Sequence, residues 1–227
     1  MTPLIKRGFF VYNGYMKSFA IACISTKDHA KTIRALKSTL KSLKNKRRVN
    51  TVYWFSNEKF PEKIDCNVEW IRINHFQDLQ KDLNYVTLKL MPHVIKEEYV
   101  LIIQSDGYAV NPESWDDKFL DYDYIGAVWT WHPEGVQVGN GGLCIRSRKL
   151  LDALLDLRIH EQPDQEDSLI CIVHSQILKD KYGIQFAPRD LADKFSIEYN
   201  IESPWMGKSF GFHGKHGIHS YYNAEID

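Results

Sequence analysis

YVLIIQSDGY, residues 99–108, is an apolar run that ends in polar and turn-forming residues. A short apolar run with such an end is typical of a buried strand. In open α/β sheets, ligands bind beyond the carboxyl ends of the strands, and Asp106 lies at that place. A carboxylate there can bind a divalent cation, although Asp106-Gly107 is equally typical of a plain turn.

On the N-terminal side of this stretch, predicted strands and helices alternate. Strands are expected at Phe19–Ser25, Asn50–Phe55 and Val68–Ile73, and helices with apolar residues at helical spacing at Lys27–Lys44 and Asp78–Ile95. This alternation predicts an α/β fold with a mostly parallel central sheet flanked by helices.

On the C-terminal side, glycine and proline interrupt the pattern. Strand-like pieces occur in Tyr122–Trp131 and Val136–Ser147, and helices are predicted at Arg148–Asp156 and Glu166–Tyr182. A tail from about residue 203 to 227 is rich in glycine, histidine and aromatic residues and lacks periodicity. Because there is no internal repeat or linker, we expect one domain over residues 1–227.

The chain carries 29 Lys+Arg and 29 Asp+Glu, but the charges are unevenly distributed. Residues 1–50 hold 12 basic residues and one acid, and most of the excess lies on residues 27–48, which comprise the basic helix at about 27–44 and its exit. A hydrophobic fraction of 44% excludes a disordered chain, and the zero net charge disfavours nucleic acid as a partner. A solvated helix face is the common explanation of such a basic run; the functional alternative is peripheral contact with an anionic membrane.

The sequence predicts a cytoplasmic protein. No apolar run approaches the roughly 18 residues of a membrane span, and no signal-peptide core is present. The four cysteines lack CxxC spacing and mostly lie in apolar runs, which favours buried free thiols over disulfides or a zinc site: Cys23, Cys66, Cys144 and Cys171.

A glycine-rich loop, VGNGGL at Val138–Leu143, is a candidate ligand-binding segment. Glycines allow a close approach of ligand and backbone, and the Asn140 amide can bind a hydroxyl group. A hairpin turn explains the same residues without a ligand. The motifs of phosphate-binding loops and of serine hydrolases do not occur in the chain.

Three further groups of residues can carry chemistry. Glu166-Asp167 begins a predicted helix, where acids favour the helix dipole, and either acid can alternatively act as a general base. His213 lies in a glycine-aromatic segment and is a candidate ligand. Trp129 and Trp131 flank Thr130, so that in a strand both rings face the same side, as core residues or as a surface for sugars.

These segments occur in a recognisable order along the chain. The ordered set resembles a bacterial family of domains of unknown function that is similar to glycosyltransferases of the GT-A type, over about residues 19–213. The motifs that carry the resemblance are Gln104–Asp106, Tyr122–Ala127, Val138–Leu143, Glu166-Asp167, Phe195–Glu198 and Phe210–His213.

The resemblance implies a GT-A-like domain that binds a nucleotide-sugar donor, a UDP-sugar being the expected one. Asp106 and His213 would bind Mn²⁺ or Mg²⁺, and Asp167, with Glu166 beside it, would activate the acceptor. Trp129 and Trp131 would contact a glycan or lipid-linked acceptor. The donor would lie against Ser25, Thr26, Gln104, Ser105, Asn140, Gly141 and Gly142.

The chain departs from the resemblance at one place. GT-A enzymes usually carry two acids as Asp-x-Asp, and here the first position is Gln104, which supplies no charge. We expect a hexosyltransferase, metal-dependent through the remaining carboxylate, in the synthesis of bacterial surface polysaccharide. The alternatives are a metal-dependent nucleotide-sugar hydrolase or phosphodiesterase, and a non-catalytic carbohydrate-binding module.

Overall fold

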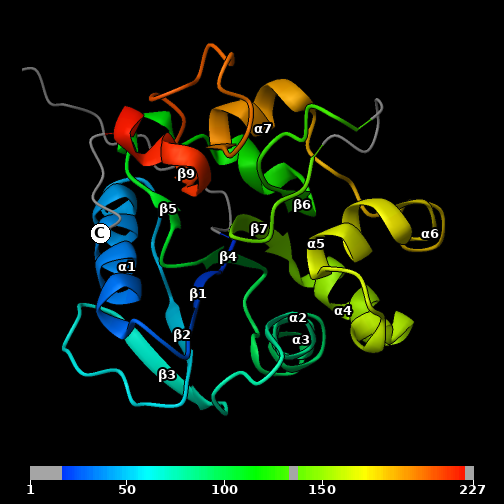
Figure 1. The fold of residues 1–227 in the computed structure, drawn as a ribbon, viewed down its shortest axis with the longest axis horizontal. Helices are drawn as coiled ribbons and strands as arrows, with labels where there is room; N and C mark the ends of the chain where they lie inside the picture. Colours follow the sequence, from blue (N-terminus) through cyan, green and yellow to red (C-terminus); the bar gives the residue numbers. More distant parts are fainter. Residues whose placement is uncertain (1–16, 133–137, 223–227) are drawn as a thin grey trace, which may run out of the picture.

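The apolar run at the start of YVLIIQSDGY forms strand β4 (Tyr99–Ile103), as the sequence predicts. The structure is a computed structural model, and it describes residues 17–132 and 138–222. β4 lies inside a six-stranded sheet of strand order β3-β2-β1-β4-β7-β6, with helices on both faces (Figure 1). All residues of β4 after Tyr99 are buried, which explains why the strand is a continuous apolar run.

The parallel part of the sheet contains β1 (Phe19–Ser25), β2 (Thr51–Ser56) and β3 (Asn67–Arg72). β1 pairs with both β2 and β4, and β2 pairs with β3, always in parallel. The predicted strands are confirmed with boundaries that agree to within one residue. Because the strands are parallel, the residues that follow β1 and β4 meet at one edge of the sheet.

The other part of the sheet is antiparallel. β7 (Leu143–Ser147) pairs with β4 and with the two-residue strand β6 (Tyr124–Ile125). The strand-like pieces predicted within 122–131 are present as β6 and an isolated bridge at Val128. After β6 the chain is not in a strand, apart from an isolated bridge between Val128 and Val138, and residues 130–131 form a turn. Of the predicted strand at 136–147, residues 136 and 137 lie outside the described residues.

Helix α1 (His29–Leu43) lies on one side of the sheet, and α2 (Leu79–Asn84) and α3 (Met91–Val94) lie on the other (Figure 1). A π-helical segment, η1 (Tyr85–Leu90), joins α2 to α3, so the helix predicted at 78–95 is present as three consecutive pieces. In α1 the apolar residues face the core, while several lysines face outward.

The helix predicted at 166–182 is also divided. It consists of α5 (Glu166–Ser168), the π-helical segment η5 (Leu169–Val173) and α6 (Ser175–Tyr182), separated from η5 by His174. A π-helical turn contains an extra residue, so the faces before and after it are rotated relative to a continuous α-helix. The remaining helices are α4 (Arg148–Leu157), α7 (Arg189–Phe195) and the short 3₁₀ segments Pro112–Ser114, Asp117–Asp121, Ile159–Glu161 and Lys215–Tyr222.

A small second sheet lies above the carboxyl end of β4. Its order is β5-β9-β8, with β5 (Gly107–Ala109) antiparallel to β9 (Gly211–His213) and β8 (Ser196–Ile197) parallel to β9. The aperiodic tail therefore contributes a strand, which sequence periodicity does not reveal. The β5–β9 register pairs Gly107 with His213 and so fixes where this histidine lies.

The basic residues of the N-terminal part partly pair with acids of the rest of the chain. Lys37 and Glu62 approach to 2.6 Å and Lys46 and Glu113 to 3.0 Å, at mostly exposed positions where ion pairs contribute little stability. Contact of the basic helix with an anionic membrane stays a prediction. None of the helices in the described part of the chain has the length and apolar character that membrane crossing requires.

Candidate functional site

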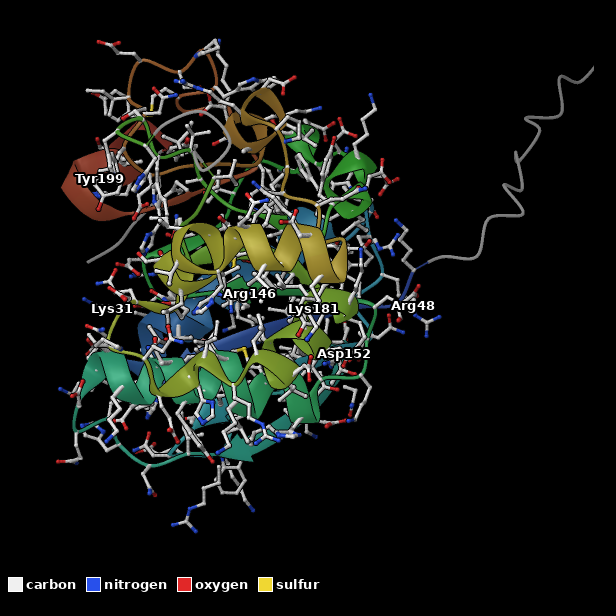
Figure 2. The ribbon with its side chains drawn as sticks, turned by 90° about the vertical axis from the view of Figure 1, so that its right-hand side faces the viewer. Lys31, Arg48, Arg146, Asp152, Lys181 and Tyr199 are labelled. Carbon is white, nitrogen blue, oxygen red and sulfur yellow. The ribbon has the colours of Figure 1, made fainter. Side chains whose placement is uncertain are left out.

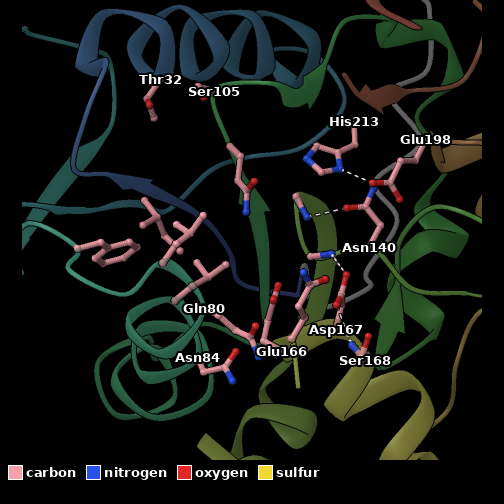
Figure 3. Close-up of a pocket in the computed structure, with 18 of the residues that line it drawn as sticks. Thr32, Gln80, Asn84, Ser105, Asn140, Glu166, Asp167, Ser168, Glu198 and His213 are labelled. Atoms are coloured by element: carbon pink, nitrogen blue, oxygen red, sulfur yellow. Dashed lines mark hydrogen bonds and ion pairs between the residues drawn. The ribbon is translucent and has the colours of Figure 1, made fainter. Parts of the chain in front are cut away.

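A pocket of about 650 Å³ opens where β1 and β4 end (Figure 3). Its walls are the residues that follow these two strands, the glycine-rich loop, the start of α5, residues of α2 and the residues around Glu198. The pocket therefore lies at the carboxyl edge of the sheet, where the sequence predicts a ligand site.

The fold brings almost all of the predicted site residues to this pocket. Asp106 is the exception: it does not line the pocket, but it contacts His213, which does. The predicted residues that line the pocket are Ser25, Thr26, Gln104, Ser105, Trp129, Trp131, Asn140, Gly141, Gly142, Glu166, Asp167 and His213.

His213 stands between two carboxylates. Its Nε2 is 3.6 Å from Oδ1 of Asp106, and its Nδ1 is 2.8 Å from Oε1 of Glu198. His213 and Glu198 are buried, whereas the Asp106 side chain is 35% exposed and can meet a ligand. Burial by itself disfavours the charged imidazole, but hydrogen bonds to Asp106 and Glu198 and their negative charges outweigh it and raise the pKa of His213 to about 9.

Two glycines allow the glycine-rich loop and His213 to lie close together. A Cβ on Gly142 would lie 2.4 Å from Nε2 of His213, and a Cβ on Gly107 would lie 2.6 Å from the carbonyl oxygen of Gly142. Any larger side chain at either position would push the loop and the histidine apart. The glycines of the loop thus serve packing between the loop and β9 in addition to any contact with a ligand.

Asn140 shapes the loop itself. It has a φ of +68°, a left-handed conformation that asparagine tolerates well, and its Oδ1 accepts a hydrogen bond from the Gly142 amide at 2.7 Å. The Tyr124 hydroxyl donates to its carbonyl oxygen at 3.0 Å. Its Nδ2 is buried without a hydrogen-bond partner among the described residues, which is unusual for a buried donor in a residue that lines a pocket.

The acid pair, Glu166 and Asp167, forms the wall opposite His213 (Figure 3). The amides of Gly141 and Ser168 donate to the two oxygens of Asp167 at 3.2 and 2.7 Å. Glu166 packs so closely on the loop that a Cβ on Gly141 would lie 1.6 Å from its Oε1. The two backbone donors hold the Asp167 carboxylate in one orientation beside the glycine-rich loop.

A buried cation lies behind the acid pair. Arg146 on β7 is fully buried, and its Nη2 is 3.6 Å from Oε1 of Glu166 (Figure 2). Its guanidinium group also lies 5.8 Å from the centre of the Tyr124 ring. Arg146 is not among the residues predicted above, although a charged residue inside the apolar run LCIRS is a usable signal, since arginine is rarely fully buried unless it is paired.

Burial raises the pKa of both carboxyl groups of the acid pair. For Glu166, burial is the main cause and the charge of Asp167 adds to it, while Arg146 acts in the opposite direction; the pKa rises to about 7. For Asp167, burial raises the pKa and the backbone hydrogen bonds from Ser168 and Gly141 lower it in part. A carboxyl group with a raised pKa is better suited to accept a proton near neutral pH.

Replacing Glu166 by Gln should therefore change how stability depends on pH. A carboxyl group with a raised native pKa binds more protons in the native than in the unfolded state, so its contribution to the free energy of unfolding falls as pH rises from about 4.5 to about 7. The variant lacks this contribution. Denaturant unfolding from pH 4.5 to 8 should show that its stability relative to the wild type increases with pH.

The exposed Glu202 supplies the matched control for this measurement. Glu202→Gln should leave the difference in unfolding free energy from the wild type constant over the same pH range. A constant difference in Glu166→Gln as well would contradict the raised pKa.

The two tryptophans differ in exposure. Trp129 is 5% exposed, whereas Trp131 is 56% exposed, and their rings stack with centroids 6.2 Å apart. The prediction that both rings project from one face of a strand is wrong, because Thr130 and Trp131 form a turn. The turn nevertheless keeps the rings together at the pocket.

The residues after β1 and β4 complete the wall. The Ser25 hydroxyl lies 2.7 Å from Nδ1 of His29, so it is already engaged within the protein. Gln104 forms a backbone bridge with Gly107, which turns the chain from β4 into β5 and presents Ser105 to the pocket. In the part of the chain that the structure describes, no three His, Cys, Asp or Glu side chains are grouped to hold a metal ion by themselves.

Comparison with protein families gives a match that covers most of the chain. The family described as "Protein of unknown function (DUF5672)" matches residues 65–213, a range that contains Asp106, the glycine-rich loop, the acid pair and His213. The chain belongs to this family. No curated protein matches the chain.

Solved structures of glycosyltransferases have the same fold. The galactosyltransferase LgtC, solved with donor and acceptor sugar analogues, is 12% identical, with a TM-score of 0.54 over 90% of this chain and 94% of its own. A glycosyltransferase involved in glycosylation of the major capsid of PBCV-1 is 10% identical, with a TM-score of 0.55 over 91% and 100%. At these identities the likeness shows that the DUF5672 chain has a GT-A glycosyltransferase fold.

Proposed function

We propose that this DUF5672 protein is a glycosyltransferase that moves a sugar from a nucleotide-sugar donor to a hydroxyl acceptor. The observation that carries the proposal is one pocket at the carboxyl edge of a GT-A fold, with His213 on one side and the acid pair on the other. Asp106 lies next to this pocket and contacts His213. Such a pocket supplies the two requirements of sugar transfer, stabilisation of the leaving diphosphate and removal of the acceptor proton.

The donor is proposed to be a UDP-sugar, with its nucleotide near Ser25 and Thr26 and its sugar against Asn140, Gly141 and Gly142. The unpartnered Nδ2 of Asn140 supports this placement, because a sugar hydroxyl can accept the hydrogen bond that the protein leaves unmade. The mannosyltransferase PcManGT from Pyrobaculum calidifontis, solved with GDP-Man and Mn²⁺, is 12% identical with a TM-score of 0.51 over 78% of this chain and 56% of its own.

The Asp106–His213 pair fits a divalent cation, Mn²⁺ or Mg²⁺. Nδ1 of His213 lies within hydrogen-bond distance of Glu198, and Nε2 faces Asp106, so Nε2 would be the nitrogen that binds a cation, with the cation taking the place of its proton. This carboxylate–histidine arrangement is typical of metal-binding histidines. Two protein ligands suffice where a diphosphate and water supply the others. The bound cation would offset the charge that develops on the leaving diphosphate.

Asp167 is proposed as the general base of an inverting reaction. The acceptor oxygen attacks the anomeric carbon, the bond from that carbon to the diphosphate oxygen breaks, and the hydroxyl proton passes to a carboxylate oxygen of Asp167. Asp167 is the better candidate of the acid pair because it is the less buried residue, while Glu166 is tied to Arg146. Glu166 and Arg146 then support its position.

The proposal extends to bacterial surface glycan synthesis in the cytoplasm, within a single domain of residues 1–227. The role in surface glycan synthesis rests on the family resemblance, whereas the location and the single domain rest on the sequence patterns described above. The reaction itself rests on the residues of the pocket.

Thermal shift with nucleotides tests the proposal. The wild-type protein should be stabilised by UDP, GDP or a nucleotide sugar, and more strongly with Mn²⁺ than without. A ligand at a hundred times its dissociation constant stabilises a protein by about 2.7 kcal/mol, an easily measured shift. Absence of any shift with all nucleotides, with and without Mn²⁺, would contradict the proposal and favour a sugar-binding module.

A further inference from the structure

The pocket has an aromatic wall in which one ring is free to meet a ligand. Trp129 is buried, and its ring packs on Gly139 so closely that a Cβ there would lie 2.3 Å from the indole. Trp131 stacks beside it with an interplanar angle of 25° and is 56% exposed. Trp129 is therefore the support, and Trp131 is the ring that offers a flat apolar surface at the pocket.

Tyr199 connects this surface with the chemistry of the pocket. Its ring meets Trp131 edge-on, with centroids 4.7 Å apart and an interplanar angle of 81°, so the two rings form a corner. Figure 2 shows Tyr199 toward the edge of the molecule, whereas Arg146 lies inside. Trp131 and Tyr199 line the same pocket as Glu198 and Asp167, so the corner and both carboxylates face one cavity.

An exposed tryptophan at such a place has a limited set of suitable ligands. The solvent-exposed ring of Trp131, next to carboxylates, suits a ligand with one apolar face and a polar edge. A sugar ring has this character, because its C–H groups cover one face while its hydroxyls project from the edge. An alkyl chain would bring apolar groups against the carboxylates of the pocket wall, among them Asp167, and would displace water without supplying a hydrogen bond in return.

We propose that the corner of Trp131 and Tyr199 binds a sugar ring of the acceptor, so that the acceptor is a saccharide that this protein extends. The inference rests on the proposed glycosyl transfer and adds the chemical class of the acceptor. Trp131 supports the apolar face of the ring, and the acceptor hydroxyl projects toward Asp167.

The test measures saccharide binding directly. Methyl glycosides and disaccharides of glucose, galactose and mannose are presented to the wild-type protein with UDP and Mn²⁺, and binding is followed by saturation-transfer NMR and titration. At least one saccharide should bind to the wild-type protein. Trp131→Ala should lower the affinity for that saccharide about tenfold, whereas Trp131→Phe should keep most of the affinity because it keeps an aromatic ring. Tyr221→Ala, which removes a 60% exposed aromatic residue outside the pocket, should change nothing.

A parallel titration with UDP separates this inference from the proposed function. If UDP binds but Trp131→Ala binds the saccharide as tightly as the wild type, the inference is wrong and the proposed function stands. If UDP binds and no saccharide binds, the inference is again wrong and the proposed function stands. Binding of dodecyl phosphate that depends on Trp131, without binding of any saccharide, would lead to the same conclusion. If neither UDP nor any saccharide binds, both are wrong.

Discussion

Asp167→Asn is expected to lower kcat for sugar transfer about 10²–10⁴-fold, the range that a positioned general base contributes. An amide cannot accept the acceptor proton, so the loss should appear in kcat while the affinity for the nucleotide is kept. The measurement is single-turnover transfer from a UDP-sugar, with nucleotide binding followed separately by thermal shift.

Glu166→Gln distinguishes the two acids of the pair. Because Glu166 is more buried and is paired with Arg146, its amide variant should lose less activity than Asp167→Asn. The reverse order would assign the base to Glu166. Equal and full activity of both variants would contradict a base in the acid pair.

Asp106→Asn is expected to lower transfer about 10²–10³-fold, a loss comparable to removing one group that stabilises the charge developing in a transition state. The side chain is partly exposed and supplies a negative charge next to His213, so the amide should impair cation binding without unfolding the protein. Mn²⁺ titration in the presence of UDP should show weaker binding of the cation in the variant.

Asp65→Asn is the matched control, since Asp65 is an exposed aspartate outside the pocket. It should retain wild-type transfer and the wild-type response to Mn²⁺. Wild-type transfer by Asp106→Asn would contradict the metal assignment and return Asp106-Gly107 to the role of a turn.

The strands and the location of the pocket could be predicted from the sequence because both follow from local patterns. Continuous apolar runs mark β1, β2 and β4, and a polar residue directly after such a run lies at the carboxyl edge of a parallel sheet. The glycine-rich loop and the acid pair were recognisable as unusual residues at the boundaries of elements. Their meeting in one pocket follows from the sheet order.

Other site residues were missed because tertiary contacts decide their role. Glu198 ends the motif Phe195–Glu198, but neither the motif nor the two-residue strand before Glu198 indicates that this carboxylate meets His213. Arg146 is identified by its burial against Glu166, which depends on how β7 and α5 pack. Tyr199 contacts Trp131 edge-on although 67 residues separate them in the chain, a contact that sequence periodicity does not predict.

The division of the helix predicted at 166–182 has a similar cause. The apolar residues of this segment suit a continuous helix, yet the chain forms a π-helical turn directly after the acid pair. Hydrogen bonds from the Gly141 and Ser168 amides hold Asp167 at the glycine-rich loop. The π-helical turn thus occurs where Asp167 contacts the glycine-rich loop, and the spacing of apolar residues in the helix does not predict it.

The pairing of β5 with β9 determines when the site can form. All six strands of the large sheet lie between residues 19 and 147, but His213 reaches Asp106 only after the chain has returned to pair Gly211–His213 with Gly107–Ala109. Contacts of such long sequence separation form late, and a chain folds from its N-terminal part during synthesis. All strands of the large sheet can thus be synthesised before the segment that carries His213, so the candidate site is completed last.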